Sequence, residues 1–412
     1  MKKRGNQSSV AKYLDEFIQA NEEDLKWQGP AALVRAPTAE ELEAQAAKMK
    51  TSATGPDGRS VEELKWAPPE YWSMTAIFWD AMISRDNLAW PDKLRRAHVV
   101  MIPKSAEGDP SDPRNLRPIT IMSASYRLFG ACIYRQLLAW QNSWMPGGII
   151  GGRAGEAQSV PLAVAIALEA AQLDVGEEVV VLTTDYSKFF DNLSWPIVSK
   201  IAKSFGLDPT FVDQMGKMVT NLSRRFTYQG IYGEEIIATN GVPQGDPLSI
   251  VWCNLLTGLW AKKLERLTPS IKAFTFIDDK YMMGTTRKIR ELQNAICITE
   301  LLDAKTGSVL NPTKTKAMAS SKQAAKELSK LRIGGQQIAR QQDLKALGFQ
   351  LSTKKRRSTK TALQRVTKAK KTIQKIARSK LCWRKKLLTI RGKGIAQLVY
   401  GSALVQASAS SM

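Results

Sequence analysis

The sequence predicts an α+β protein, and three observations indicate this class. Segments with helical spacing of apolar residues alternate with short apolar strands along the chain. The continuous apolar run Val179–Leu182 is typical of a buried strand, and Asp185 follows it. The segment at 274–284, "FTFIDDKYMMG", has the form of a hairpin with Asp278 and Asp279 at its tip. At 412 residues, the chain is long enough for two or three domains.

The remaining elements follow from caps, apolar spacing and turn residues. A Thr cap and an acidic first turn predict a helix at 38–50, within a polar, helical N-terminal region. Further helices are expected at 68–83, 160–172, 251–267 and 288–304. A strand followed by a long helix is expected at 116–140, and short strands at 95–104, 332–338 and 344–352.

The positive charge of the chain is concentrated at its C-terminal end. The formal net charge is +22, but the last acidic residue is Asp343, and 18 Lys and Arg follow it. The preceding part therefore carries only about +4. Apolar residues recur at near-helical spacing through the basic stretch, at Leu363, Val366, Ile373, Ile376 and Leu381. This pattern predicts packed helices with one basic face that contacts nucleic acid, with a solvated charge run as the alternative.

Several classes of site are disfavoured by composition. The four cysteines are far apart and His98 is the single histidine, which argues against a Cys/His zinc site and a Ser-His-Asp triad. The N-terminal residues have no apolar segment typical of a secretory signal, and no apolar run reaches the roughly 18 residues of a membrane helix. We therefore expect an intracellular protein without a membrane partner, and a nuclear location is compatible with this.

Three carboxylates stand at strand ends, and Asp278 lies 93 positions after Asp185. If the strands are neighbours in one sheet, Asp185, Asp278 and Asp279 meet at one edge, where repulsion raises at least one pKa. Mg²⁺ relieves this conflict because it prefers hard oxygen ligands. Two such ions roughly 3.5–4 Å apart serve nucleotidyl transfer, as a polymerase palm requires. A polar turn is the alternative for Asp278 and Asp279.

Nine segments in a fixed order carry a family resemblance. They are "TGPDGRS", "VVMIPK", "NLRPITIMSASYRLF", "DYSKFFDNL", "GVPQGDPLS", "FIDD", "LNPTKTKAM", "LKALGFQL" and "QLVYGSALV". Together they cover roughly residues 50 to 405 and resemble reverse transcriptases of the non-LTR (LINE-like) retrotransposon and group II intron type. The resemblance implies a right-hand polymerase with fingers, a palm built from an antiparallel sheet and helices, and a helical thumb.

The resemblance also implies roles for individual residues. Asp185 and Asp278 match the metal ligands and Asp279 the supporting carboxylate, for two Mg²⁺ ions or alternatively Mn²⁺. The expected nucleotide contacts are the phosphate-binding Lys104 and Arg117, the sugar gate Phe190, the loop residues Gln244 and Gly245, and Lys314, which would neutralise the leaving pyrophosphate. The expected primer or template contacts are Ile277, Leu347, Gly348, Lys368, Lys371 and Lys375.

The sequence departs from the family pattern at a few positions. Ile250 stands where the family usually has Pro, Ile277 where Ala is common, and Phe189 where many relatives have Ala. The segment "IIGGRAGEAQS" at 149–159 lacks the usual Gln-Gly-Phe beginning, which puts its contacts in doubt. None of these differences affects an expected metal ligand.

The implied domains are an N-terminal helical extension at 1–50, fingers at 51–175, a palm at 176–350 and a basic thumb at 351–412. The implied activity is RNA-directed DNA synthesis with an RNA template, a DNA or RNA primer and dNTPs. The alternatives are an RNA-dependent RNA polymerase, with Asp191 as a ribose sensor, and a catalytically idle RNA-binding derivative. No endonuclease segment is recognised, so the chain is a fragment, acts with a separate endonuclease partner, or has been repurposed.

Overall fold

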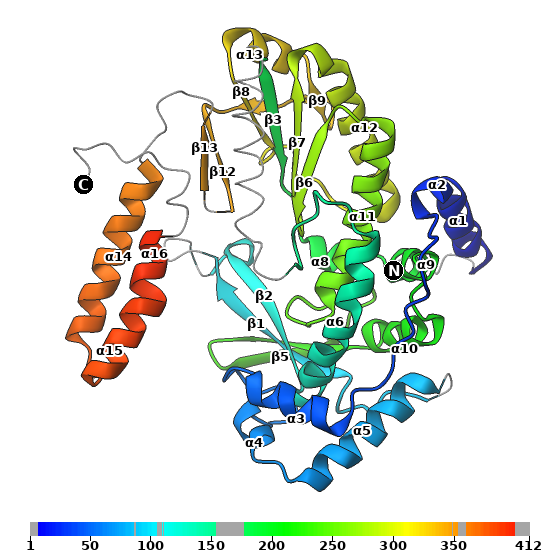
Figure 1. The fold of residues 1–412 in the computed structure, drawn as a ribbon, viewed down its shortest axis with the longest axis vertical. Coiled ribbons are helices and arrows are strands. Elements are labelled where there is room, and N and C mark those ends of the chain that lie inside the picture. The colour runs from blue at the N-terminus through cyan, green and yellow to red at the C-terminus, as the bar shows by residue number, and fades with distance from the viewer. Residues whose placement is uncertain are drawn as a thin grey trace. The chain divides into compact units, whose positions relative to one another are not determined.

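The computed structural model describes residues 7–85, 88–104, 109, 111–153, 177–347, 349–352 and 360–399. Helices and strands are mixed throughout these ranges, which confirms the α+β class (Figure 1). The chain divides into two compact units that are not contiguous in sequence. Unit 1 comprises 1–153, 186–263 and 299–310, and unit 2 comprises 154–185, 264–298 and 311–412.

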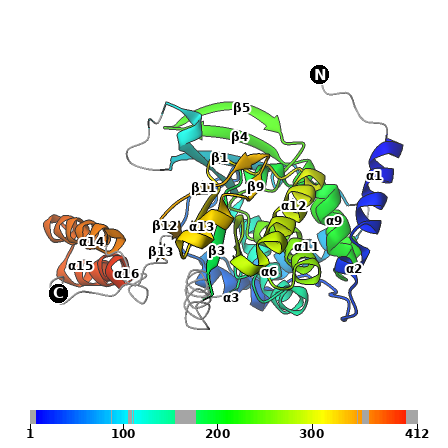
Figure 2. The same cartoon turned by 90° about the horizontal axis from the view of Figure 1, so that it is seen from above.

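The sheet of unit 1 has four strands in the order β2-β1-β4-β5, and β1, β4 and β5 lie side by side in Figure 2. Their bounds are Arg96–Pro103 (β1), Leu116–Met122 (β2), Ser223–Tyr228 (β4) and Ile231–Ile237 (β5). β1 pairs antiparallel with β2 and parallel with β4, and β5 is exposed along its whole length. The strands β4 and β5 were not anticipated from the sequence.

Helices surround the core of unit 1. They are α1 (Gln7–Gln19), α2 (Glu22–Leu25), α3 (Ala39–Lys48), α4 (Val61–Lys65), α5 (Pro69–Ser84), α6 (Ala124–Trp144), α8 (Phe189–Asn192), α9 (Trp195–Ser204) and α10 (Pro209–Thr220). The predicted cap at Thr38 is confirmed, because its side chain accepts from the amide of Glu41 and the Glu41 side chain accepts from the Thr38 amide. Trp79, which stacks on Phe129 at 4.2 Å, is fully buried, as expected of a core residue.

The sheet of unit 2 has five strands in the order β11-β8-β3-β7-β6. Their bounds are Val179–Thr184 (β3), Lys272–Phe276 (β6), Asp279–Thr285 (β7), Lys316–Ala319 (β8) and Ala339–Arg340 (β11). The central strand β3 pairs antiparallel with β7 and with β8, and its residues Val179–Leu182 are fully buried. Helix α13 (Lys322–Leu328) packs against β8 and β3. The predicted buried strand and the predicted hairpin are therefore neighbours.

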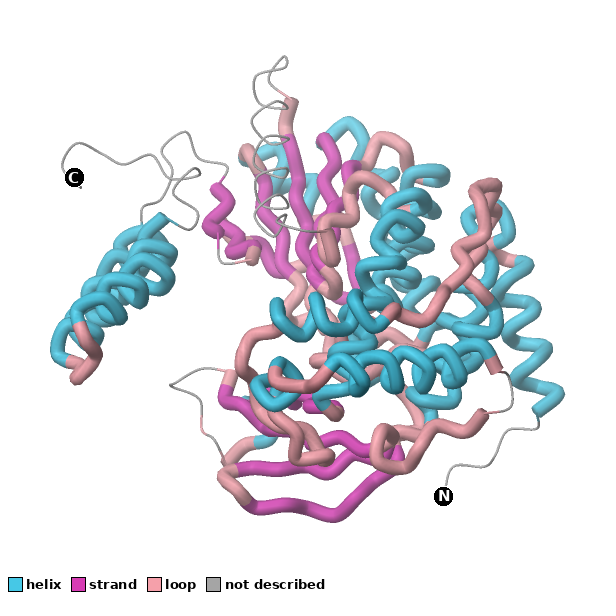
Figure 3. Tube along the Cα trace, turned by 60° about the horizontal axis from the view of Figure 1, so that its bottom comes forward, coloured by secondary structure: helices cyan, strands magenta, loops and turns pink. Residues whose placement is uncertain are grey.

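Two helices cross from one unit to the other, α11 (Ser249–Leu267) and α12 (Ile289–Thr306). Unit 2 also contains the hairpins β9 (Arg332–Ile333) with β10 (Gln336–Gln337) and β12 (Asp343–Ala346) with β13 (Phe349–Ser352). The basic C-terminal region forms α14 (Lys360–Arg378), α15 (Trp383–Thr389), a π-helical turn η3 (Ile390–Ile395) and α16 (Ala396–Val399). Figure 3 shows this region as a group of helices without strands.

The elements predicted from the sequence are largely confirmed. The helices expected at 38–50, 68–83, 251–267 and 288–304 correspond to α3, α5, α11 and α12, and the long helix after a strand corresponds to β2 and α6. The segment expected as a strand at 332–338 is a short hairpin that turns at Gly334 and Gly335, both at positive φ. The helix expected at 160–172 lies outside the described residues, as does part of the glycine-rich segment at 149–159.

Candidate active site

Asp185 and Asp279 are brought alongside each other by the register of β3 and β7. The last pair between these antiparallel strands is Thr184 with Lys280, so Asp185 and Asp279 are the next residues on each side. The amide of Asn311 donates to the carbonyl of Asp185 at 2.8 Å and holds this strand end in place. The strand that precedes Asp185 is buried, whereas the Asp185 side chain is 41% exposed. The buried central strand β3 is therefore followed directly by a carboxylate that solvent can reach.

Asp278 lies in a two-residue turn between β6 and β7, since Phe276 pairs with Asp279. The first residue of this turn, Ile277, has φ of 61°, a conformation that glycine adopts freely and a β-branched residue does not. A Thr275 hydroxyl bond to the Ile277 carbonyl at 3.1 Å supports the turn. The hairpin thus holds Asp278 and Asp279 through a strained backbone, at an expected cost of about 1–3 kcal/mol.

The three carboxylates act on one another electrostatically. Burial and, to a smaller extent, the negative charges of Asp278 and Asp185 together raise the pKa of Asp279 to about 7. The pKa of the buried Tyr281 is also raised, first by burial and then by Asp279 and Asp278. Burial is the larger cause of both pKa shifts, and the neighbouring carboxylates at the ends of β3 and β7 add to it.

Lys314 supplies a positive charge next to Asp185. Its ammonium Nζ lies 3.7 Å from a carboxylate oxygen of Asp185, and its side chain is 65% exposed. The turn that carries Lys314 is tied to the same strand end, because Asn311 binds the Asp185 carbonyl and accepts from the Lys314 amide at 3.2 Å. Such an exposed ion pair contributes little to stability, so Lys314 is free to exchange partners.

The donor set fits divalent cations, although the carboxylates are not arranged as a finished metal site. Among the residues in the described ranges, no three Asp, Glu, His or Cys side chains already form a group that could hold one ion. The chemistry of the donors nevertheless suits Mg²⁺, which binds carboxylate oxygens. Burial and the charges of Asp278 and Asp185 raise the pKa of Asp279, and a bound cation would favour its ionised form.

Lys104 and Arg117 lie at the end of the β1–β2 hairpin in unit 1. Arg117 pairs with Ile102, and Lys104 follows Ile102 by two residues, just beyond the end of β1 at Pro103. The Lys104 amide still donates across to the Asn115 carbonyl at 2.8 Å, so alternation places both basic side chains on one face. Both are exposed, and the Lys104 ammonium donates to the Arg114 carbonyl at 2.8 Å. Two exposed cations on one hairpin face provide a surface suited to phosphate oxygens.

Phe190 belongs to the single-turn helix α8, which begins after Lys188 in a left-handed conformation with φ of 50°. The Phe190 carbonyl accepts from the amide of Val242 at 2.8 Å, which links α8 to the Gln-Gly loop. Phe189 is buried and contacts Phe190 edge-on at 6.4 Å. The ring of Phe190 is half-buried, so one side remains accessible.

The loop at 241–248 is fastened to β2. The carbonyl of Gln244 accepts from the Thr120 amide at 2.6 Å. Gly245 has φ of 122°, and a Cβ atom there would lie 2.5 Å from the Thr120 carbonyl oxygen. Only glycine satisfies both conditions, which explains why glycine is needed after Gln244 in this chain.

Asp246 and Tyr126 form a buried polar pair that the sequence analysis missed. Asp246 is 4% exposed and accepts from the amide of Leu248 at 3.2 Å and the hydroxyl of Ser249 at 3.4 Å. Burial raises the pKa of Asp246 to about 7 and outweighs these bonds, which lower it. Tyr126 faces this carboxylate, although its hydroxyl lies outside standard hydrogen-bond geometry. In the sequence, the feature that could have drawn attention to Asp246 is the Gln-Gly motif directly before it.

The expected primer and template residues are partly placed by the structure. Leu347 lies in the turn of the β12–β13 hairpin with φ of 44°, while Gly348 lies outside the described residues.

Lys368, Lys371 and Lys375 are exposed on α14 at helical spacing. The apolar side of α14 packs through Ile376 and Ile373, which contacts the backbone at Gly394. Packing is less complete than expected, because Leu363, Val366 and Leu381 remain about half exposed.

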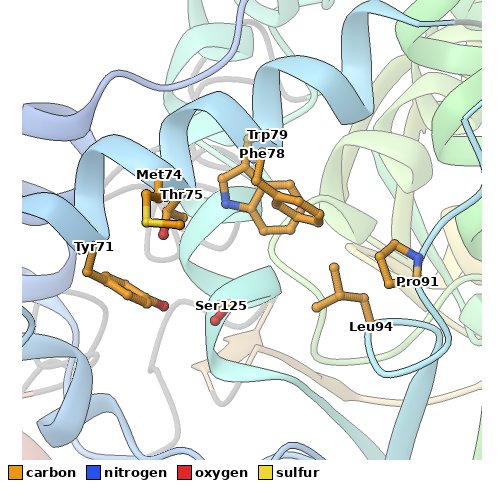
Figure 4. A pocket seen from close by; sticks show the side chains of 8 residues that line it. All are labelled: Tyr71, Met74, Thr75, Phe78, Trp79, Pro91, Leu94 and Ser125. Atoms are coloured by element: carbon orange, nitrogen blue, oxygen red, sulfur yellow. The ribbon is translucent and has the colours of Figure 1, made fainter.

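A separate pocket of about 430 Å³ lies in unit 1 and contains none of the predicted site residues. Figure 4 shows its lining side chains from α5, the following loop and the start of α6, which are Tyr71, Met74, Thr75, Phe78, Trp79, Pro91, Leu94 and Ser125. The lining is mainly apolar, and Met74 is 72% exposed. This pocket is distinct in composition from the acidic and basic groups described above.

Residues 102–351 match the family described as reverse transcriptase (RNA-dependent DNA polymerase). This segment contains β2, the last residues of β1, β3, β7 and the Gln-Gly loop, so it spans the strand-end carboxylates and the basic hairpin. The chain belongs to the reverse transcriptase family. Members of this family typically use divalent metal ions and act on nucleic acid templates and primers with dNTPs.

Within the family, the chain is similar to two retrotransposon polyproteins. It is 27% identical over 255 residues to the Pol polyprotein of the type-2 retrotransposable element R2DM of Drosophila melanogaster, covering 58% of this chain and 22% of the polyprotein. It is 28% identical over 149 residues to the Pol polyprotein of the type-1 retrotransposable element R2 of Popillia japonica, covering 34% and 24%. The chain therefore spans less than a quarter of the length of these relatives.

Two solved telomerase structures from Candida tropicalis are also similar. The complex with a fragment of telomeric RNA aligns with a TM-score of 0.48 at 12% identity, over 82% of this chain and 58% of that chain. The apo form truncated from its C-terminal domain aligns with a TM-score of 0.41 at 16% identity, over 56% of this chain and 51% of that chain.

No helix within the described part of the chain is both long and apolar enough to cross a bilayer.

Proposed function

We propose that this protein is an RNA-directed DNA polymerase of a retroelement, which adds dNTPs to a primer 3′-OH by two-metal nucleotidyl transfer. One observation carries the proposal. The β3–β7 register sets Asp185 beside Asp279, whose pKa is raised to about 7 by burial and by its two acidic neighbours. Carboxylates that lie this close repel one another, and binding of divalent cations relieves the repulsion.

In the proposed reaction, Asp185 and Asp278 would hold two Mg²⁺ ions, and Asp279, at the start of β7, would support them. The bound ions would supply positive charge at the attacking and leaving oxygens. Mn²⁺ would be accepted by the same oxygen donors. Lys314, which pairs with Asp185 at 3.7 Å, would neutralise the leaving pyrophosphate when that carboxylate holds a cation. Its exposed, flexible side chain suits this exchange.

The remaining residues bind and select the substrates. Lys104 and Arg117 present cations on one hairpin face for the triphosphate oxygens. Phe190 occupies the position where an aromatic ring excludes a ribose 2′-OH and so favours deoxynucleotides. Gln244 and Gly245 support the nucleotide and the templating base through the loop fastened to Thr120. The primer end contacts Ile277, Leu347 and Gly348, and the basic face of α14 holds the template–primer duplex through Lys368, Lys371 and Lys375.

Extension of a primed RNA template tests the proposal. With Mg²⁺ and dNTPs the wild-type protein should extend the primer, and Asp278→Asn should lower the rate by about 10³-fold, because charge stabilisation of the transition state is lost. Asp213→Asn is the matched control, since Asp213 pairs with Lys203 on the surface of unit 1. Undiminished extension by Asp278→Asn would remove this residue from the reaction.

A further inference from the structure

Arg224 carries a buried guanidinium group in the middle of the unit 1 sheet. It lies on β4, opposite Ala97 of β1 and Ile236 of β5, and its side chain is only 8% exposed. Its Nε and Nη2 atoms are buried and have no hydrogen-bond partner in the structure. Burying a cation with unsatisfied donors is unfavourable, so a compensating charge is expected nearby.

The compensating charge is Asp191, which directly follows Phe190. Its Oδ1 lies 3.9 Å from Nη1 of Arg224, and its side chain is 39% exposed. Burial lowers the pKa of Arg224, and the charge of Asp191 opposes this shift. The separation is longer than a direct hydrogen bond, so the attraction is electrostatic. Strand β4 and helix α8 are thereby coupled through their side chains.

The backbone around Asp191 is already held closely. The Asp191 amide donates to the Lys188 carbonyl at 3.0 Å, and Gly241 donates to the Leu193 carbonyl at 2.9 Å. A Cβ atom at Gly241 would lie 2.6 Å from the Asp191 Cα, so the two segments are in contact. These bonds fix where α8 lies along the loop, and the attraction of Asp191 to Arg224 adds a constraint on its rotation.

A four-residue helix cannot maintain its own orientation, because one turn contributes too few hydrogen bonds to offset its ordering. The direction of the Phe190 ring must therefore depend on anchors outside α8. Phe189 provides an apolar anchor by its burial, and Asp191 provides a charged one. The two anchors flank Phe190 in sequence, so a change at either one would turn its ring.

We infer that Arg224 is a positioning residue for Phe190, which it holds through Asp191 in the orientation that excludes a ribose 2′-OH. This inference rests on the proposed function, in which Phe190 selects deoxynucleotides. The inference also gives Asp191 a role other than that of a ribose sensor in an RNA polymerase, because its carboxylate pairs with the Arg224 guanidinium. Loss of Arg224 frees α8 to rotate and widens the space beside the ring.

The test compares kcat/KM for a dNTP and the matching rNTP in primer extension. Arg224→Met and Asp191→Asn should each lower the dNTP-to-rNTP ratio by about tenfold, mainly through a lower KM for the rNTP. Arg224→Lys retains the charge and should keep most of the discrimination. Arg225→Met is the matched control, because the adjacent Arg225 is exposed and pairs with Glu235 at 3.6 Å. It should leave the ratio unchanged.

A purely structural role for Arg224 would lower kcat/KM for both nucleotides by the same factor, and this result would overturn the inference.

The variant Phe190→Ala distinguishes a failure of the positioning role of Arg224 from a failure of the proposed function. If Phe190→Ala lowers the ratio and Arg224→Met does not, the positioning role alone is wrong. If Phe190→Ala leaves the ratio intact, the gate itself is wrong. In a Phe190→Ala background, Arg224→Met should cause no further change in the ratio. Should Arg224→Met fail to fold, the ratios measured for Asp191→Asn and Arg224→Lys decide between the two roles.

Discussion

Two consecutive residues, Gly245 and Asp246, constrain the Gln-Gly loop by different means. Gly245 is required by space and backbone conformation, since it has positive φ and lies against the Thr120 carbonyl. Asp246 is required by polarity, since it caps the loop by accepting from Leu248 and Ser249. The first constraint is insensitive to pH, and the second depends on the protonation of a buried carboxyl group.

Gly245→Ala should lower the free energy of unfolding by about 2–3 kcal/mol, because the added Cβ cannot fit beside Thr120 without moving the loop. Urea unfolding measures this change. Gly230→Ala is the control, because Gly230 also has positive φ but has open space around it. It should cost only about 1 kcal/mol. Equal costs at both positions would show that the contact with Thr120 contributes nothing.

Asp246 should make stability depend on pH near neutrality. Its pKa in the folded protein is about 7, above the ordinary value of 3.8. The folded state therefore binds the proton more tightly, and stability falls as pH rises through this range. The difference of about three pKa units corresponds to at most about 4 kcal/mol. Asp246→Asn should flatten the decrease in unfolding free energy between about pH 4 and about pH 7, whereas Asp213→Asn should leave it unchanged.

At the scale of elements, the C-terminal helices combine a partly buried apolar side with an exposed basic side. Ala369 and Ile376 are buried, while Lys368, Lys371 and Lys375 face solvent along α14. The Thr372 hydroxyl also lies 3.1 Å from the Gln397 side chain and links α14 to α16. The charges are therefore carried by a packed helical element, as the sequence predicted, and are available to a polyanion.

Replacing these three lysines together by Ala should weaken binding of an RNA–DNA duplex and reduce the slope of log affinity against log salt by about 2 to 3, because fewer counterions are released. Fluorescence anisotropy over a series of salt concentrations measures the slope. The control replaces Lys322, Lys326 and Lys330, three exposed lysines of α13 and its following turn. An unchanged slope in the α14 variant would contradict the nucleic-acid role of this helix.

The sequence predicted best those elements whose information is local. The cap at Thr38, the apolar run of β3 and the Asp278–Asp279 hairpin are each specified within a few residues, and all are present. The pairing of β4 with β1 could not be anticipated, since it joins residues more than a hundred positions apart. Arg224 and Asp246 could not be anticipated for the same reason, because the burial of both side chains depends on segments distant in sequence.

At the scale of the whole molecule, the proposed functional residues are divided between the two units. Asp185, Asp278 and Lys314 belong to unit 2, whereas Lys104 and Arg117 belong to unit 1. The chain passes between the units five times, including twice within the continuous helices α11 and α12. Neither unit is a contiguous segment, so neither can be isolated by cutting the chain at one place.

This division predicts separable responses to metal and nucleotide. Mg²⁺ should raise the melting temperature of the wild-type protein by a few degrees relative to EDTA, because only the folded state offers the converging carboxylates. Asp278→Asn should lose this increase. Lys104→Ala should retain the increase with Mg²⁺ but lose the additional one given by a dNTP. Differential scanning fluorimetry measures both, and a metal response that persists in Asp278→Asn would contradict the proposed ligand.

The absence of Asp, Glu and His after Asp343 has a consequence for how the enzyme would respond to its medium. The charged side chains of the basic helices are therefore all of one sign, and their contacts with a polyanion release counterions. Their attraction for a polyanion should weaken as the ionic strength rises. A bell-shaped pH profile of synthesis would then report on the carboxylates of the sheet edge and loop, whereas retention of the template would follow salt.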